Sequence, residues 1–317
     1  MINPPLLITR QEVNQLLDWP AVVDATRKGL IAEGSAADTS SVSTQVLYGL
    51  GSLHLKAASL ESEKILSVKA NLRPSHGGVS GVLLAYDLAT QRLAGIIDAG
   101  LMTARRTGAI AAVAATYLNS VKPVRVAVLG AGPVGIECAH GLLRELNVAE
   151  LRIWSPNFTN AQRAALTLAA SWDTVIIPCQ AVSDATSGTN IVITATPAST
   201  PILTTDNLES NTLILAMGAD SVGKREISPE VLQNSDVVAD APDDALRVGE
   251  SAYLDPERKS HVIPISQLLA SSAHLERSRR HLIFDSVGSS YVDAAITSVI
   301  MTRALSMGLG RELHLSD

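Results

Sequence analysis

The first hundred residues pass from a helical to a strand-like pattern of apolar positions. Apolar residues recur at helical spacing between Leu16 and Ile31, and Pro20 suits the first turn of a helix. After Ser40 the apolar residues gather in short runs that are separated by glycine-rich or polar turns. We expect these runs to form an antiparallel sheet: Gln45–Leu50, Ile65–Ala70, Val82–Tyr86 and Leu93–Asp98.

A second pattern begins at Thr103. The alanine-rich run Thr103–Leu118 predicts a closely packed helix, which Lys122-Pro123 would end. Strand-like and helical segments then alternate, which is typical of a parallel sheet with helices on its faces. The predicted strands are Arg125–Leu129, Leu151–Trp154, Val175–Ile177, Ile191–Thr194, Leu213–Ala216, Val237–Ala239 and Leu282–Phe284. A last helix is predicted at Tyr291–Met307, and we expect it to pack on the first domain.

These patterns predict an α/β protein with two domains. One is a Rossmann domain with a doubly wound parallel sheet, and the other is an α+β domain completed by the C-terminal helix. The chain of 317 residues is longer than one core usually serves, and a composition of 46% hydrophobic and 18% charged residues suits packed layers. We place the first domain at residues 1–122 with 289–317 and the Rossmann domain at residues 123–288.

The charge and the cysteines narrow the classes of function. The net charge is −6 and there is no basic run, which argues against capture of nucleic acid or an anionic membrane. No signal peptide is evident, and no apolar run is long enough to span a bilayer. Cys138 and Cys179 lack metal-ligand spacing, so we predict no metal site and a reducing compartment. We therefore expect a cytoplasmic protein that binds neither nucleic acid nor membrane.

A glycine-rich loop follows the first predicted Rossmann strand. Its sequence, Gly130-Ala131-Gly132-Pro133-Val134-Gly135, leads into a predicted helix that ends at Leu146. Gly130 would allow a tight turn, Gly132 the close approach of a pyrophosphate and Gly135 the close packing of helix on strand. The positive end of the helix dipole would face the diphosphate. The alternative to a nicotinamide dinucleotide site is an ordinary glycine turn. The expected cofactor contacts here are Gly130, Gly132, Pro133, Val134 and Gly135.

The end of the second Rossmann strand bears on the choice of cofactor. NAD-selective sites usually carry an acidic residue there, whereas this chain has Trp154-Ser155-Pro156-Asn157. We therefore favour NADP(H) over NAD(H), which stays possible, with Ser155 and Asn157 as hydrogen-bond donors. Arg152 or Arg163 would supply positive charge for a 2′-phosphate. The alternative is that Ser155 only caps the following turn.

Three further positions are candidates for chemistry. Lys69 shares a strand face with Ser67, although a lone lysine is usually solvated. Arg105 and Arg106 point roughly 100° apart on a helix, so we expect one of them to turn inward and meet an anion. That anion would be a substrate carboxylate, a cofactor phosphate or a structural salt-bridge partner. Asp220 follows a predicted strand at the carboxyl edge of the sheet, where ligands bind; its alternative role is a helix cap.

Several separated motifs, in this order, resemble the ornithine cyclodeaminase and μ-crystallin family over most of the chain. They are Val68-Lys69, Gly81–Asp87, Asp98 with Thr103–Ala109, Gly130–Gly132, Thr194–Thr196, Gly218–Asp220 with Gly223-Lys224, and Asp285–Gly288. The resemblance implies that the first domain binds the substrate and forms a homodimer through its sheet. It also implies that the Rossmann domain lies, in sequence, between the two segments of the first domain.

The resemblance implies roles for individual residues. Family members hold the substrate carboxylate with an Arg, a Lys and a second Arg, which correspond here to Gln45, Lys69 and Arg106. Gln45 lacks the charge of the first Arg, and Lys56 would replace that charge. The catalytic Asp of the family corresponds to Asp220. The other implied positions are the cofactor contacts Arg106, Thr107, Thr196, Met217, Gly218, Lys224 and Ser286, and the substrate contacts Val287 and Gly288.

The implied function is hydride transfer at a carbon–nitrogen bond beside a carboxylate. NADPH would reduce a small imino acid, such as pyrroline- or piperideine-2-carboxylate, or an L-amino acid such as arginine would be oxidised. Lys69, Arg106 and Lys56 would hold the carboxylate. Asp220 or Lys69 would handle the proton on nitrogen.

Two alternatives stay open. One is an ornithine cyclodeaminase-type ammonia lyase with tightly bound NAD, and the other is a protein that binds a small ligand with NADPH but without turnover. Gln45, His54 and Lys56 depart from the cyclodeaminase pattern, which disfavours ornithine cyclisation.

Overall fold

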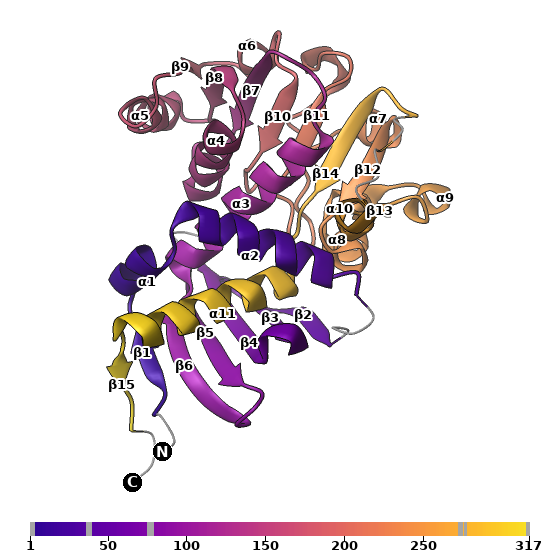
Figure 1. The fold of residues 1–317 in the computed structure, drawn as a ribbon. Helices are drawn as coiled ribbons and strands as arrows, with labels where there is room; N and C mark the ends of the chain where they lie inside the picture. Colours follow the sequence, from indigo (N-terminus) through magenta and orange to yellow (C-terminus); the bar gives the residue numbers. More distant parts are fainter. Residues whose placement is uncertain (1–3, 36–39, 75–78, 272–274, 276–277, 315–317) are drawn as a thin grey trace. The chain divides into compact units, whose positions relative to one another are not determined.

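The computed structural model describes residues 4–35, 40–74, 79–271, 275 and 278–314 (Figure 1). The chain divides into two compact units, residues 1–106 with 289–317 and residues 107–288. Helix α3 (Gly100–Leu118) contains the boundary at residues 106 and 107. Each unit is built on a sheet of its own.

The first unit contains a seven-stranded sheet. Its strands are β1 (Leu6–Ile8), β2 (Ser41–Tyr48), β3 (Gly51–Leu60), β4 (Ile65–Pro74), β5 (Ser80–Asp87), β6 (Arg92–Asp98) and β15 (Arg311–Glu312). Their order in the sheet is β15-β1-β6-β5-β4-β3-β2. Strands β2 to β6 form the predicted antiparallel arrangement, whereas β1 pairs parallel with β6. The strand-like runs of the sequence did not include β1, β3 or β15, and Leu50 lies in a turn rather than in β2.

Besides the start of α3, the described part of this unit contains the helices α1 (Arg10–Leu16), α2 (Trp19–Ala32) and α11 (Ser290–Met307), with a short 3-10 turn at Glu61–Glu63. Asp18 starts α2, since its side chain accepts a hydrogen bond of 2.9 Å from Ala21 N. Leu16 therefore belongs to α1 and not to the helix predicted from residue 16. At Gly29 a Cβ would lie 2.4 Å from the Cα of Val292, so α2 and α11 pack backbone against backbone.

Strand β3 was not predicted from the sequence, because its polar residues face inward and its apolar residues face outward. Helix α11 contacts β3 and β4 on the inner face of the sheet. His54 is buried, and the register places Lys56 directly opposite Lys69, which is also buried. The apolar Leu53 and Leu55 alternate with these residues and so point to the outer face. A strand with polar residues inward does not match the usual half-buried pattern.

The outer face of the sheet is apolar. A row of apolar residues crosses five strands in register: Val42, Ala57, Val68, Leu84 and Ile96. The exposed fraction is 52% at Val46, 41% at Leu72 and 46% at Val82. This face therefore presents a broad apolar surface within the described part of the first unit.

The second unit contains an eight-stranded sheet in which all pairs are parallel. Its strands are β7 (Val124–Leu129), β8 (Val148–Trp154), β9 (Val175–Cys179), β10 (Ile191–Thr194), β11 (Leu213–Ala216), β12 (Ser235–Ala239), β13 (Ile263–Pro264) and β14 (His281–Asp285). The order β13-β12-β14-β11-β10-β7-β8-β9 confirms the predicted doubly wound sheet. The chain proceeds from β7 outward to β9 and then returns to β10 on the other side. The carboxyl end of β7 thus lies at the switch point where ligands of such folds bind.

The helices of the second unit, besides the end of α3, are α4 (Pro133–Glu145), α5 (Phe158–Ala169), α6 (Val182–Thr186), α7 (Pro229–Gln233), α8 (Pro242–Val248), α9 (Pro256–Lys259) and α10 (Ile265–Ser271), with 3-10 turns at Thr205–Asn207 and Glu250–Tyr253. Helices α3 and α4 approach closely, because a Cβ at Gly108 would lie 2.4 Å from the carbonyl oxygen of Glu137.

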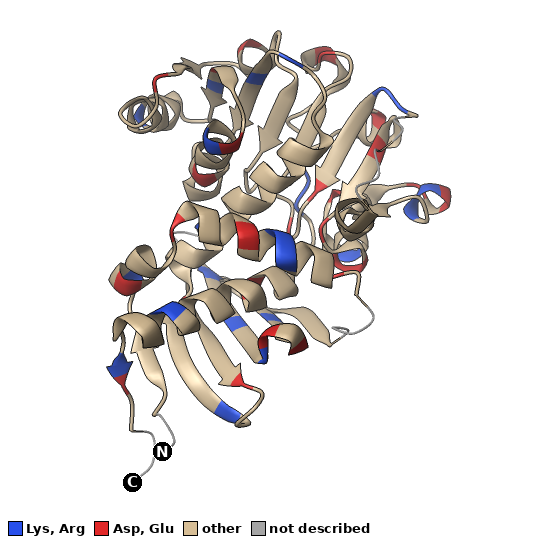
Figure 2. Cartoon of the chain, viewed as in Figure 1, with Lys and Arg blue, Asp and Glu red and all other residues tan. Residues whose placement is uncertain are grey.

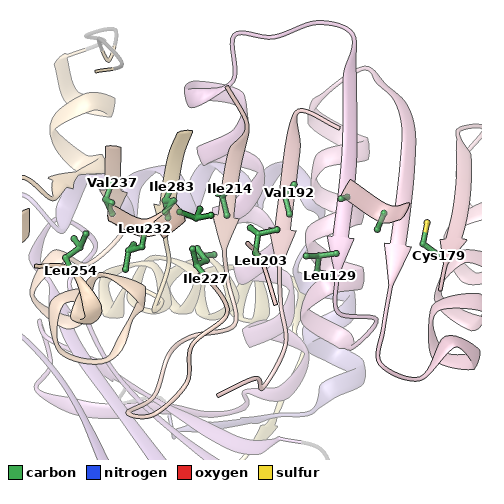
Figure 3. Packing of buried hydrophobic residues seen from close by; sticks show 14 residues of the cluster. Leu129, Cys179, Val192, Leu203, Ile214, Ile227, Leu232, Val237, Leu254 and Ile283 are labelled. Carbon is green, nitrogen blue, oxygen red and sulfur yellow. The ribbon is translucent and has the colours of Figure 1, made fainter. Parts of the chain in front are cut away.

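A hydrophobic core covers one face of this parallel sheet (Figure 3). The strands contribute a row of aligned side chains: Ala127, Val192, Ile214, Ile283 and Val237. Leu203, Ile227, Leu232 and Leu254 pack on them from the connecting segments. Every residue of β10 and β11 is buried, which explains why these strands appear in the sequence as uninterrupted apolar runs.

Charged residues of both signs occur along the ribbon of each unit (Figure 2). Among the described residues, no helix is both long enough and apolar enough to cross a membrane.

Candidate active site

Two cations and one carboxylate meet in the interior of the first unit. Lys69 on β4, Arg106 on α3 and Asp293 on α11 are 2%, 5% and 1% exposed. Lys69 Nζ donates a hydrogen bond to Asp293 Oδ2. Arg106 Nε lies 3.1 Å from Asp293 Oδ1 as an ion pair, although these two atoms are not aligned for a hydrogen bond. Of the two adjacent arginines, Arg106 is thus the one that turns inward, while Arg105 donates to the carbonyl oxygen of Leu17 at 2.9 Å.

Lys56 and Gln45 lie on the same inner face of the sheet. The antiparallel register places Lys56 opposite Lys69, and Gln45 opposite His54, which precedes Lys56 by two residues in β3. Lys56 is half-buried. We call Lys56, Lys69, Arg106 and Asp293 the cation cluster. It holds three basic side chains and one acidic one, so it carries an excess of positive charge when all four are ionised.

Burial and the neighbouring charges shift the pKa values of Lys69 and Asp293. Burial lowers the pKa of Lys69 to about 7, and the positive charge of Arg106 acts in the same direction, whereas Asp293 opposes it. Burial by itself would raise the pKa of Asp293, but the charges of Lys69 and Arg106 lower it overall. Asp293 is therefore ionised at neutral pH, where Lys69 changes its protonation state.

The glycine loop of the second unit fits a diphosphate. Gly130 has a φ of +124°, and a Cβ there would lie 2.3 Å from the carbonyl oxygen of Ala195. A Cβ at Gly135 would lie 1.9 Å from the carbonyl oxygen of Gly130, so both glycines are required by the packing of the protein. At Gly132, the N-cap of α4, a Cβ would meet no described atom within 4 Å. The protein does not need a glycine there for its own packing, and the open space lies at a helix N-terminus, which favours anions. Pro133 and Val134 form the first turn of α4.

The end of β8 carries the residues predicted for the adenosine side. Ser155 is buried, and Asn157 rather than Ser155 caps α5, because its Oδ1 accepts from Thr159 N at 3.0 Å. Arg152 is engaged within the unit: its Nε lies 2.5 Å from Glu150 Oε1, and it donates to two carbonyl oxygens at 2.8 Å. Arg163 is exposed on α5.

The remaining predicted positions follow the neighbouring strands. Thr196 follows β10, Met217 and Gly218 follow β11, and Ser286, Val287 and Gly288 follow β14, so all lie at the carboxyl edge of the sheet with the glycine loop. Thr107 is buried in α3. Asp220 is not a helix cap but lies in the loop after β11, where its Oδ1 is 2.8 Å from Lys224 Nζ. Lys224 also donates to the carbonyl oxygen of Gly218 at 3.2 Å.

Buried acidic residues hold these loops. Sequence reasoning included Asp285 only as part of a family motif and did not single out Asp240 or Glu250. Asp240 accepts hydrogen bonds from Ser286 Oγ at 2.7 Å, Val287 N at 3.1 Å and Gly288 N at 2.8 Å. Asp285 accepts from Glu250 N at 3.2 Å and from Ser251 N and Oγ at 2.7 and 2.6 Å. Burial raises the pKa of Asp285 to about 7 and that of Glu250 to about 8. In the described part of the chain, no group of His, Cys, Asp and Glu side chains is placed to hold a metal ion.

Known proteins are similar to this chain in sequence and in fold. Ketimine reductase mu-crystallin from Macropus fuliginosus is 26% identical over 227 residues, which cover 72% of this chain and 69% of that protein. An archaeal alanine dehydrogenase, a dimer with bound NAD, has the same fold with a TM-score of 0.90 at 22% identity, covering 98% of this chain and 99% of that one. Thermococcus litoralis Δ1-pyrroline-2-carboxylate reductase, in complex with NADH and L-proline, gives a TM-score of 0.89 at 21% identity over 97% and 100% of the two chains.

The sequence model of one family covers almost the whole chain. It matches residues 6–308, which include every strand of the parallel sheet and every member of the cation cluster. The chain therefore belongs to the ornithine cyclodeaminase/mu-crystallin family.

Proposed function

We propose that this protein is an NADP(H)-dependent oxidoreductase that acts on the carbon–nitrogen bond of a small 2-imino acid or L-amino acid. The observation that carries the proposal is the cation cluster, since three basic side chains surround a single buried carboxylate. Asp293 is the carboxylate paired with both buried cations, Lys69 and Arg106, so the excess of positive charge favours a second anion. The carboxylate of an amino or imino acid has the charge and size for that position.

Each basic residue has a distinct part in holding this carboxylate. Asp293 compensates about one charge and fixes Lys69 and Arg106 in place. Arg106 has a planar fork of donors that can bind a carboxylate in a bidentate manner. Lys56 lies opposite Lys69 and would supply the positive charge that Gln45, in place of the family's first Arg, does not carry. These cations would also draw electron density from the adjacent imine carbon and so make it more electrophilic.

A nicotinamide cofactor, when bound, supplies or accepts the hydride. The chain itself must supply or remove the proton on nitrogen. Asp220 is the proposed proton donor and acceptor, because it lies at the ligand-binding edge of the sheet and Lys224 holds its carboxylate at 2.8 Å. Lys69 is the alternative, since a pKa of about 7 lets it exchange a proton at neutral pH.

Reduction of cyclic imines such as pyrroline- and piperideine-2-carboxylate, with NADPH oxidation at 340 nm, tests the proposal. We expect turnover in this direction or, with NADP⁺, oxidation of an L-amino acid from a panel that includes arginine. Asp220→Asn should lower kcat by about 100-fold or more, because general acid–base catalysis contributes that much. The Kd for NADPH should stay within about twofold of wild type, which is a change of only a few tenths of a kcal/mol.

Other outcomes would replace the proposal. Ammonia release from ornithine without net absorbance change indicates a cyclodeaminase. Tight NADPH binding without turnover of any substrate in the panel indicates a binding protein.

The pH dependence of substrate affinity follows from Lys69. The protonated amine attracts the carboxylate, and its pKa in the folded protein is about 7, so kcat/KM should fall as the pH rises through that value. The charged groups that face Lys69 are Lys56, Arg106 and Asp293. Lys69→Met should raise KM about 10- to 100-fold and remove this step from the profile.

Lys28 provides the matched control for Lys69. It forms an exposed ion pair with Glu63, so Lys28→Met should leave both KM and the pH profile unchanged. A profile that keeps the same step in Lys69→Met would rule out Lys69 as the titrating anchor.

The preference for NADP(H) would rest on Arg163. No carboxylate follows β8 to repel a 2′-phosphate, and Arg152 is already engaged with Glu150 and two carbonyl oxygens. Arg163→Ala should weaken NADPH binding about 10- to 150-fold with little effect on NADH, because one charge-assisted hydrogen bond is worth about 1.5–3 kcal/mol. Gln162→Ala, at the adjacent exposed position of α5, is the control. Tighter binding of NADH than NADPH by the wild type would contradict the preference itself.

We also propose that the protein is a homodimer formed through the outer face of the first unit's sheet. A broad apolar surface with Val46 and Leu72 exposed in one row supports this interface. Light scattering should give twice the chain mass of 33.3 kDa. The double variant Val46→Glu with Leu72→Glu should be monomeric, while Leu305→Glu on the exposed side of α11 should stay dimeric. A dimeric double variant would place the interface elsewhere.

A further inference from the structure

Glu226 links two loops at the carboxyl edge of the second unit. Its side chain is completely buried. Oε1 accepts hydrogen bonds from Thr196 N and Thr196 Oγ1, both at 2.7 Å. Oε2 accepts from Gly218 N at 3.0 Å. One carboxylate therefore joins the loop after β10 to the loop after β11.

These two loops lie on one side of the glycine loop. In the sheet, β8 lies on one side of β7, whereas β10 and β11 lie on the other. A dinucleotide whose diphosphate rests on the start of α4, with its adenosine at the end of β8, must extend its other half over β10 and β11. Thr196 and Gly218 thus belong to the part of the edge that would receive the nicotinamide half.

The junction is tightly packed. A Cβ at Gly218 would lie 2.4 Å from Glu226 Oε2 and 2.5 Å from the carbonyl oxygen of Thr196, so only glycine fits. Glu226 is itself fixed by its backbone, since its N–H donates to Glu250 Oε1 at 2.6 Å and its carbonyl oxygen accepts from Ile202 N at 2.8 Å. The distance between the two loops is therefore determined by one side chain that cannot move freely.

Both carboxyl oxygens of Glu226 act as hydrogen-bond acceptors. Burial raises its pKa, and the donors of Thr196 and Gly218 oppose that effect. The groups that donate to the carboxyl oxygens from these two residues are Thr196 N, Thr196 Oγ1 and Gly218 N. Both oxygens are needed as acceptors, one for each loop.

We propose that Glu226 is a positioning residue of the cofactor site, which sets the spacing between Thr196 and Gly218 and thereby the fit of the nicotinamide half. The inference rests on the proposed function, since it requires that the edge binds a nicotinamide dinucleotide. Glu226 acts through the two loops and does not itself touch the cofactor.

The substitution Glu226→Gln distinguishes a positioning role, which needs two acceptor oxygens, from a role in which the side chain only fills space. Glutamine has nearly the shape of glutamate but only one acceptor oxygen, and its amide group is a donor. In either orientation of the amide, an N–H of Thr196 or of Gly218 would face another donor. Glu226→Gln should therefore release one of the two loops and leave the other in place.

Glu250 offers a matched control in the same buried network. Its Oε1 accepts from Glu226 N, and its Oε2 has no hydrogen-bond partner among the described residues. Because burial raises the pKa of Glu250 to about 8, this carboxyl is neutral at pH 7. Glu250→Gln keeps the neutral charge and an acceptor oxygen for the N–H of Glu226.

Calorimetric titration of the full chain with NADPH, NADH and ADP tests the proposal. ADP carries only the adenosine and diphosphate parts, so it does not reach the loops after β10 and β11. We expect Glu226→Gln to weaken both NADPH and NADH at least about tenfold while the Kd for ADP stays within about twofold. Glu250→Gln should leave all three affinities within that margin.

Each outcome decides between the possibilities. Wild-type protein that binds neither NADPH nor NADH refutes the proposed function itself. Unchanged NADPH affinity in Glu226→Gln, or equal losses for NADPH and ADP, refutes the positioning role alone. If Glu226→Gln is recovered unfolded, Gly218→Ala replaces it as the test. The added methyl group would push Glu226 and Thr196 apart, so this variant must show the same selective loss of NADPH and NADH affinity. Wild-type NADPH affinity in Gly218→Ala overturns the proposal.

Discussion

A buried charged or polar group costs free energy unless an opposite charge or hydrogen-bond partners surround it, and this constraint shapes both units. In the first unit Asp293 is ionised only because Lys69 and Arg106 lie against it. In the second unit Asp240 and Glu226 are surrounded by backbone N–H groups from loops at the sheet edge. Thr196, Gly218, Val287 and Gly288 lie beyond the ends of their strands, and the buried acids supply acceptors for their N–H groups. The requirement to satisfy buried polar and charged groups thus places the residues that could bind ligands.

The parts of the fold that follow hydrophobic burial could be predicted from the sequence. Strands β10 and β11 are buried on both faces and could be recognised as apolar runs. The glycine loop could be recognised by its spacing, because the packing at Gly130 and Gly135 leaves no room for a Cβ. Strand β3 was not visible, because His54 and Lys56 point inward and invert its pattern. Short strands such as β1 and β15 carry too few residues to show a period.

Only part of the candidate site could be predicted from the sequence. Lys69, Arg106 and Asp220 could be proposed from strand face, helix geometry and sheet edge. Their partners could not, since a single acidic residue in a helix, such as Asp293, or in a loop, such as Glu226, is usually solvated. Only the fold brings Asp293 next to Lys69, which is 224 positions away in the chain. The likeness to solved structures at 21% and 22% identity establishes the fold, while the choice of substrate depends on side chains such as Gln45 and Lys56.

The reversed faces of β3 have an evolutionary consequence. Alternate residues of this one strand serve separate surfaces: Lys56 and His54 belong to the face with the cation cluster, and Leu53 and Leu55 belong to the apolar outer face. Point substitutions can therefore alter one surface and spare the other. Insertion or deletion of a single residue within β3 would exchange them at once, sending leucines inward and charge outward. Divergence in this segment should proceed by replacement at constant length.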